Sequence, residues 1–216
     1  MAYARGVRTR IPFSSIAGHP ALDAVNTVHW RLSPDRWADR LEGFDDLLAW
    51  SFQFGFIDDE AATHLESLAQ AHPDLAASEL TRVRALREGL YVAAYQSDES
   101  GAELLAGEYA EAIAAGRLQR LFTDENAPRR WHFDVDLALP RRRLTLAAVD
   151  LLTQTDPGVL GQCADDDCGW VFVDTSPRNN RRWCVATDCG NRNRVRRHNE
   201  RARLASPPVE GASDPV

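Results

Sequence analysis

Four cysteines stand in two equally spaced pairs, and this pattern most restricts what the chain can fold into. Four residues separate Cys163 from Cys168, fifteen residues follow, and four residues again separate Cys184 from Cys189. Every cysteine of the 216-residue chain falls inside this window. The spacing is open to three interpretations: two disulfides, four buried free thiols, or one tetrahedral metal site.

A structural zinc site is the best of these interpretations. The first residues, MAYARGVRTRIPF, lack the apolar centre and cleavage site of a signal peptide, so we expect a cytoplasmic protein whose thiols are kept reduced. No apolar run approaches the roughly 18 residues that cross a bilayer, so we expect no membrane partner. Two short cysteine loops can supply a tetrahedron of thiolates to Zn²⁺, and iron is the main competitor. Four protein ligands leave no position for an activated water, which indicates a structural role.

The densest run of positive charge overlaps the cysteines. Between residues 176 and 203, nine arginines face only Asp188 and Glu200, although the whole chain has a net charge of −7. Such a compact patch on an acidic chain indicates a localised anionic partner. We expect phosphate contacts from Arg178, Arg181, Arg182, Asn191, Arg192, Arg194, Arg196, Arg197 and Arg201. A surface that binds an acidic protein, including the acidic body of this same chain, is the alternative.

Residues 191–204 are expected to form a helix with two outward basic faces, with Cys189-Gly190 at its beginning. A narrow apolar strip of Val195 and Ala202, flanked by His198, would dock it against the rest of the protein. His198 is otherwise interpreted as an ordinary helix residue, because four thiolates already complete the metal site. The acidic run Asp165–Asp167 is interpreted as a solvated turn.

The residues before the cysteines indicate a mainly helical protein. Apolar side chains recur at helical spacing over residues 22–28, 41–55, 58–71, 80–94 and 102–118, with Asp58 as an N-cap and Pro73 as a stop. Alternation over residues 131–137 predicts a strand, paired with residues 118–122 through the connection TDENAPRR. Pro140 then opens a last helix.

These patterns give a fold class and domain limits. We predict a mainly α protein with a small β-hairpin, made of a helical N-terminal domain (residues 1–157) and a small C-terminal zinc finger with four cysteine ligands (158–205). In the finger, a hairpin is followed by the basic helix in a treble-clef-like arrangement. Residues 206–216 are rich in proline, serine and glycine, and we expect them to be disordered.

Polar residues of the first predicted helix form a candidate ligand site. Asp23, Asn26 and Trp30 would lie on or near its more polar side, where they could bind a small molecule. An enzyme using Asp23, Asn26, His29 and His132 is the weaker hypothesis, because the sequence has no GxGxxG, P-loop, GxSxG or HExxH motif. We therefore expect no enzymatic activity.

The cysteine window resembles the CGNR zinc finger. The match runs from about Cys163 to Arg203 and includes the segment CGWVFVDTSPRNNRRWC and the tetrad Cys189-Gly190-Asn191-Arg192. Ala186 departs from this pattern at a position where methionine is common, which we interpret as a packing variation. The segment GHPALDAVNT, with Leu22, Asp23, Asn26 and Thr27, resembles the start of the ABATE domain, described as a putative stress-induced transcription regulator.

The resemblance implies a bacterial transcription regulator with a C-terminal DNA-binding finger and an N-terminal helical domain that senses a ligand. Dimerisation through the helical domain is a separate expectation, from the common practice of transcription regulators. The expected partners are duplex DNA and a small-molecule effector, with a homodimer tethering two weak fingers. A zinc-dependent adaptor that binds RNA or protein without reading a DNA sequence is the alternative function.

Overall fold

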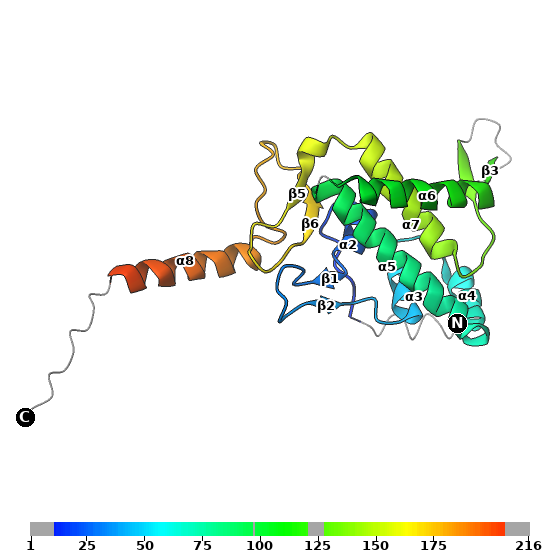
Figure 1. Ribbon diagram of the computed structural model, residues 1–216, viewed down its shortest axis with the longest axis horizontal. Coiled ribbons are helices and arrows are strands. Elements are labelled where there is room, and N and C mark those ends of the chain that lie inside the picture. Colours follow the sequence, from blue (N-terminus) through cyan, green and yellow to red (C-terminus); the bar gives the residue numbers. More distant parts are fainter. Residues whose placement is uncertain (1–10, 97, 121–127, 206–216) are drawn as a thin grey trace, which may run out of the picture.

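Seven α-helices and three short hairpins are present in the part of the chain that the computed structural model describes, which is residues 11–96, 98–120 and 128–205. The helices before the cysteines are α2 (Pro20–Val25), α3 (Phe44–Gln53), α4 (Asp59–Ala71), α5 (Pro73–Tyr95), α6 (Glu99–Ala115) and α7 (Leu139–Gln154). The long helix α5 packs against α6 and α7, and α2 and α3 pack on the same group (Figure 1). We call this group the helical body.

The helix boundaries follow the expected capping residues. The Asp58 carboxylate accepts a hydrogen bond from the Ala61 N–H (2.9 Å) and begins α4. Pro73 separates α4 from α5 and occupies the first turn of α5, and Pro140 lies in the first turn of α7. These predictions are confirmed. They could be made from the sequence because a capping residue or a proline acts on the backbone within about one turn.

The core of the helical body collects the apolar stripes of these helices. Its largest fully buried side chains include Trp50 of α3 and leucines from almost every element: Leu22, Leu41, Leu47, Leu48, Leu65, Leu86, Leu90, Leu105 and Leu139. Strands Leu160–Gln162 (β5) and Val171–Val173 (β6) contribute Leu160, Val171 and Val173 to the same core. The body and the cysteine region therefore share packed apolar surface.

The first predicted helix is shorter than expected. Helix α2 ends at Val25, and Val28 lies in strand β1 (Val28–His29), which pairs antiparallel with β2 (Ala38–Asp39). The Thr27 hydroxyl donates to the Ala24 carbonyl (2.7 Å) at the point where the helix stops. Branched residues such as Val25, Thr27 and Val28 also lose side-chain freedom in a helix, which favours this early end.

The predicted hairpin in the body is present but also shorter. Strands β3 (Arg117–Arg120) and β4 (Arg129–His132) pair antiparallel, with Leu118 opposite Trp131. The strand ends at His132 because the chain turns into α7, with the Asp136 side chain accepting the Ala138 N–H (3.0 Å). Most of the predicted connection lies outside the described residues, as do residues 1–10 and the tail 206–216.

The cysteine region has the predicted hairpin-and-helix arrangement. After the short 3₁₀ turn η1 (Pro157–Val159), β5 pairs antiparallel with β6, and the chain continues to the basic helix α8 (Cys189–Ala205). Figure 1 shows α8 projecting away from the helical body. The predicted fold class, mainly α with a treble-clef-like finger, is confirmed. None of the described helices combines the length and apolar character needed to cross a membrane.

Candidate metal centre and basic helix

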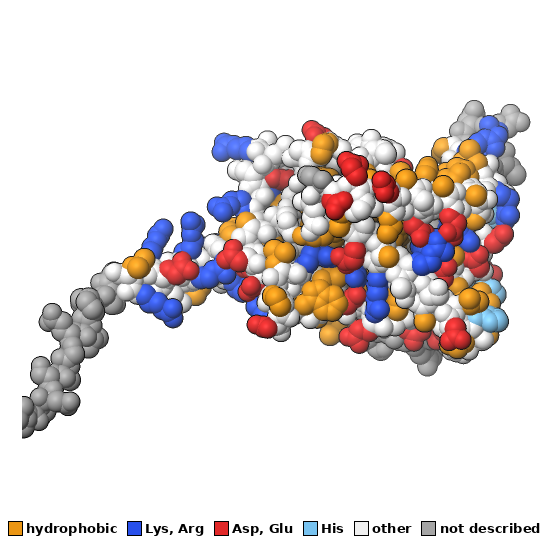
Figure 2. All heavy atoms as spheres, viewed as in Figure 1, with side chains coloured by type: hydrophobic (Ala, Val, Ile, Leu, Met, Phe, Trp, Pro, Cys, Tyr) orange, Lys and Arg blue, Asp and Glu red, His pale blue; other side chains and the backbone are white. Residues whose placement is uncertain are grey.

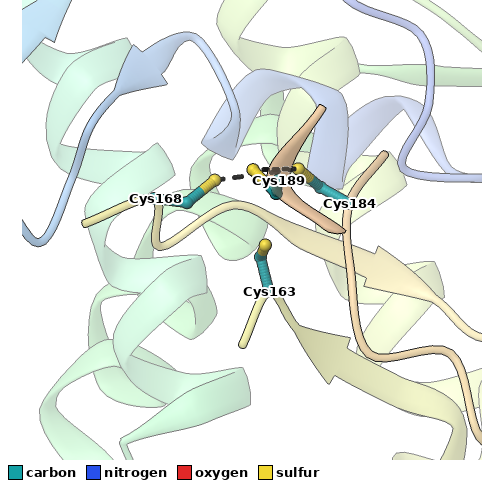
Figure 3. Close-up of side chains that lie close together, drawn as sticks. All are labelled: Cys163, Cys168, Cys184 and Cys189. Carbon is teal, nitrogen blue, oxygen red and sulfur yellow. Dashed lines mark hydrogen bonds between the residues drawn. The ribbon is translucent and has the colours of Figure 1, made fainter. Parts of the chain in front are cut away.

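The four cysteines converge from four different places in the finger. Cys163 directly follows β5, and Cys168 precedes β6. Cys184 lies in the loop between β6 and α8, and Cys189 is the first residue of α8. All four are buried, and their sulfur atoms lie within 4.8 Å of one another. Figure 3 shows the Cys163 sulfur facing the other three. The Sγ–Sγ distance is 3.7 Å from Cys168 to Cys184 and 3.3 Å from Cys184 to Cys189.

This geometry fits a tetrahedral zinc ion. A zinc–sulfur bond of about 2.3 Å places the sulfurs of a regular tetrahedron about 3.8 Å apart, close to the distances found here. Disulfides need sulfurs about 2.05 Å apart, and all four cysteines are free thiols. The prediction of a single metal site is therefore confirmed over two disulfides, and Zn²⁺ is the cofactor that this donor set binds.

The electrostatics of the thiols also call for a cation. Hydrogen bonds from the Cys168 and Cys184 thiols lower the pKa of Cys163, whereas the hydrogen bonds that Cys184 donates raise its own pKa. Four sulfurs this close cannot all ionise without a positive ion between them. The Arg192 guanidinium supplies nearby positive charge, with Nη2 2.8 Å from the Cys189 sulfur. Arg192 thus supports the metal centre from outside its ligand set.

A small apolar cluster surrounds the metal centre. Phe172 is fully buried there, and Ile16, Trp170, Trp183 and Val185 pack around it. So few large apolar side chains form a small core for a folded module. The metal therefore carries much of the finger's folding free energy.

Arg181 belongs to this cluster. Its guanidinium stacks on the Phe172 ring, 4.0 Å from the ring centre. It also donates to the carbonyl oxygens of Cys184 (2.7 Å), Ile16 (3.2 Å) and Trp183 (3.2 Å). These contacts use its donors inside the protein, so it ties the loop between the cysteine pairs to the N-terminal segment.

One side of α8 is paired with acidic residues. Arg192 contacts Asp188 (2.5 Å) and Asp165 (3.6 Å), and Arg196 contacts Asp166 (2.7 Å). Asp165 is buried, at 2 % exposure, so the interpretation of the whole acidic run as solvated turn residues is wrong for this residue. A cleft of about 610 Å³ on this side also contains Arg36, Asp167, Asn191, Val195, Asn199, Glu200 and Arg203.

The other side of α8 is open and basic. A groove of about 390 Å³ there is lined by Arg182, Trp183, Gly190, Asn193, Arg194, Arg197, His198 and Arg201. None of these lining residues is acidic, and Arg182, Arg194, Arg197 and Arg201 form no ion pair within the described part of the chain. We call these four arginines the open basic face. Figure 2 shows arginine side chains standing out from opposite sides of α8.

The apolar strip of α8 does not dock as expected. Val195 is 52 % exposed, and Ala202 and His198 are also exposed, because α8 is held near its start, as far as the contact of Arg196 with Asp166, and then projects away from the body. Arg178 is exposed in the loop between the cysteine pairs. The structure therefore brings together four of the predicted phosphate-binding residues and places the others on the acidic side, in the loop or inside the finger.

The candidate ligand residues of α2 lie at the junction with the finger. The Asn26 amide donates to the Val171 carbonyl (2.9 Å) and accepts the Val171 N–H (2.8 Å), so it binds the edge of β6. Asp23 accepts the Ala17 N–H (3.0 Å). Both side chains are buried, so the expected polar side of α2 faces the protein interior. Their binding of a small molecule stays a prediction.

Trp30 and Arg36 form a contact that the sequence did not reveal. The Arg36 guanidinium lies 3.2 Å from the centre of the Trp30 ring, and the Arg192 guanidinium lies 4.5 Å from it. The Trp30 ring thus makes cation–π contacts with Arg36 of the β1–β2 connection and with Arg192 of α8. Trp30 has φ 53°, a left-handed backbone conformation that is uncommon for a residue other than glycine.

Asp23 predicts a pH dependence of folding. Burial raises its pKa to about 6, against the hydrogen bonds from the Ala17 and Ile16 N–H groups. Its stabilising contribution is therefore complete below about pH 4, where the unfolded chain also holds the proton, and is lost as the pH rises through about 6. In urea unfolding, wild type should lose about 2 to 3 kcal/mol relative to Asp23→Asn between about pH 4 and pH 7.

The matched control is Asp35→Asn, which changes an exposed aspartate of the same segment. Its unfolding free energy should follow that of wild type across the same range. Parallel curves for wild type and Asp23→Asn would show that the buried carboxyl keeps an ordinary pKa.

A helical body that carries a buried four-cysteine centre and a basic helix defines a zinc-finger protein. Residues 160–202 match the family model of the CGNR zinc finger. Residues 18–155, more than half of the chain, match the model of the ABATE domain, described as "Putative stress-induced transcription regulator". The chain therefore belongs to the ABATE family and carries a CGNR zinc finger, as its motifs indicate. These descriptions are of regulator and zinc-finger types rather than enzymes. No curated protein matches the chain.

Proposed function

We propose that this protein is a DNA-binding transcription regulator that contacts duplex DNA through the open basic face of α8. The observation that supports this most is the division of the helix into two sides. On one side Arg192 and Arg196 already have carboxylate partners, and on the other the open basic face is left for an external anion. That face consists of Arg194, Arg197 and Arg201 of α8 and Arg182 of the loop before it. Phosphate oxygens suit these donors because guanidinium groups bind them with two parallel hydrogen bonds.

The shape of α8 suits a DNA groove. Its 17 residues span about 25 Å, and most of its side chains beyond the first turn are exposed. The major groove of B-DNA is about 12 Å wide and admits an α-helix. The metal centre fixes the start of α8, so the helix enters a groove with little loss of conformational freedom.

The charge distribution favours a localised contact. The chain has a formal net charge of −7, whereas α8 contains six arginines and a single glutamate. The acidic body repels phosphates elsewhere on the molecule, and this limits non-specific adhesion.

The test compares two neighbouring arginines of the same helix. Arg197→Gln removes a member of the open basic face, whereas Arg196→Gln removes an arginine already paired with Asp166. With about four phosphate contacts, the slope of log K against log salt should be about −3 to −4 for wild type. Arg197→Gln should reduce it by about 1, and Arg196→Gln should change it less. Equal effects of the two variants on the slope, or DNA binding that does not change with salt, would contradict the assignment of the open basic face as the DNA contact.

The competing function is an RNA- or protein-binding adaptor that uses the same surface. Titration of duplex DNA against an RNA duplex of the same sequence separates the two nucleic acids, because an A-form major groove is too deep and narrow for a helix. Tighter binding of RNA, or binding of an acidic protein alone, would favour the adaptor.

We further assign the response to the helical body, residues 1–157, and DNA contact to the finger, residues 158–205. In a bacterial cytoplasm, a small effector or dimerisation through the body would then alter DNA binding. The contacts of Asn26 and Trp30 with the finger support this, because they join the two parts directly.

A further inference from the structure

A pocket of about 630 Å³ lies in the helical body and is separate from the residues of the finger and of the open basic face. It is formed by the loop before α4, the first turns of α4, the end of β4 and the start of α7. Its lining residues are Gly55, Phe56, Ile57, Asp58, Glu60, Ala61, His64, His132, Phe133, Val135, Leu139 and Arg143. Figure 2 shows histidine side chains at the end of the body away from α8. The volume is in the range of small-molecule sites.

Arg143 distinguishes this pocket from an ordinary surface hollow. It follows two arginines of α7 whose charge is already balanced: Arg141 has three glutamate partners, and Arg142 donates to both Asp136 carboxylate oxygens (2.8 and 2.9 Å). Arg143 is half-buried, and its guanidinium has no hydrogen bond or ion pair with any other described residue. Its Nε atom is shielded from solvent without a partner.

The surroundings of Arg143 compensate its charge only in part. Burial lowers its pKa, and Asp58 is the carboxylate that opposes this effect. The Asp58 side chain is already used to cap α4 through the Ala61 N–H. Glu60 also lines the pocket, but it is exposed to solvent. A half-buried cation with no bonded partner is unfavourable by itself, and a bound anion would remove that cost.

The walls of the pocket indicate the rest of the ligand. Phe133, Ile57 and Leu139 are buried side chains of the body core, and Phe56 and Val135 add further apolar surface. His64 and His132 offer ring nitrogens at the exposed side. We propose that this pocket binds a small organic acid, with its carboxylate on Arg143 and its apolar group against the two phenylalanines. An effect of the bound acid on DNA contact would rest on the proposed function, whereas binding of the acid to this pocket does not depend on it.

The experiment uses the full zinc-loaded chain and three probes: phenylacetate, its neutral counterpart phenylacetamide, and acetate. Binding is measured by NMR titration at millimolar concentration without DNA. Phenylacetate should bind at least about tenfold more tightly than either other probe, because only it offers both a charge for Arg143 and a ring for the apolar walls. Arg143→Gln should remove the preference for the acid over the amide.

The matched control is Arg142→Gln, the same change one residue earlier on α7, where the arginine is bound to Asp136 outside the pocket. It should keep the tenfold preference. Absence of phenylacetate binding, or an equal preference in wild type and Arg143→Gln, would overturn the pocket assignment. A separate DNA titration of wild type without any acid tests the proposed function, so failure of either proposal is distinguishable from failure of the other.

Discussion

Replacement of Cys184 by serine is expected to abolish stoichiometric zinc binding and to lower the melting temperature of the whole chain by about 10 °C or more. The Cys184 sulfur lies 3.7 Å from that of Cys168 and 3.3 Å from that of Cys189. Its loss therefore removes one of the four thiolates that surround the metal position. Structural zinc contributes about 10 to 16 kcal/mol in isolated finger peptides, and the small cluster around Phe172 cannot replace it.

The loss should extend into the helical body because the metal centre is bonded to it. The backbone N–H of Arg31 donates to the Cys168 carbonyl (3.0 Å), and that of Leu32 donates to the Asp167 carbonyl (3.3 Å). Gly169 has φ +68° and passes so close that a Cβ there would lie 2.8 Å from the Arg31 side chain. Without zinc, backbone amides in β1, β2 and their connection should therefore lose protection in hydrogen exchange.

The control for this experiment is Ala164→Ser, which introduces the same side chain at an exposed position directly after Cys163. Zinc content by mass spectrometry and the melting temperature should both stay close to wild type. Full zinc occupancy in Cys184→Ser would show that three sulfurs suffice, and an unchanged melting temperature would show that the metal does not support the fold.

The metal centre could be predicted because its information is local. Each cysteine pair closes a loop of four residues, and the distance between thiols in such a loop depends little on the rest of the fold. The N-cap at Asp58 and the helix start marked by Pro140 were predictable for the same reason, since both residues act within one turn. The start of α8 at Cys189 also followed from the motif.

The assignment of individual arginines could not be predicted because it depends on residues distant in the sequence. Arg181 and Arg197 look alike in the sequence, yet the guanidinium of Arg181 is bonded to the carbonyl of Ile16, 165 residues away. Asn26 looks like a polar ligand residue, but it binds the backbone of Val171, 145 residues away. Spacing along one helix indicates which side chains share a side, and does not indicate which side meets the acidic turn at Asp165.

The buried charge of Arg141 gives the second large expected effect. This side chain is 1 % exposed and contacts Glu79 (2.7 Å), Glu108 and Glu111 (2.8 Å), which come from α5 and α6. Arg82 contacts Glu108 (2.9 Å) and Glu111 from the outside. Although burial opposes its charge, hydrogen bonds to Glu79 and Glu111 raise the pKa of Arg141. One cation thus holds three carboxylates at the place where α5, α6 and α7 meet.

Arg141→Gln is expected to destabilise the chain by about 3 to 5 kcal/mol at neutral pH, because it removes the buried cation and leaves three partly buried carboxylates to share Arg82 alone. Hydrogen bonds from Arg82 and Arg141 lower the pKa of Glu111 to about 2, so this stabilisation is present above about pH 4.5 and is lost as the pH falls toward 2. The difference between wild type and variant in urea unfolding should therefore narrow in acid. Arg142→Gln, which breaks only the half-exposed bridge to Asp136, should cost about 1 kcal/mol or less. If the two substitutions cost the same, or if the difference is constant with pH, the network contributes no more than a surface ion pair.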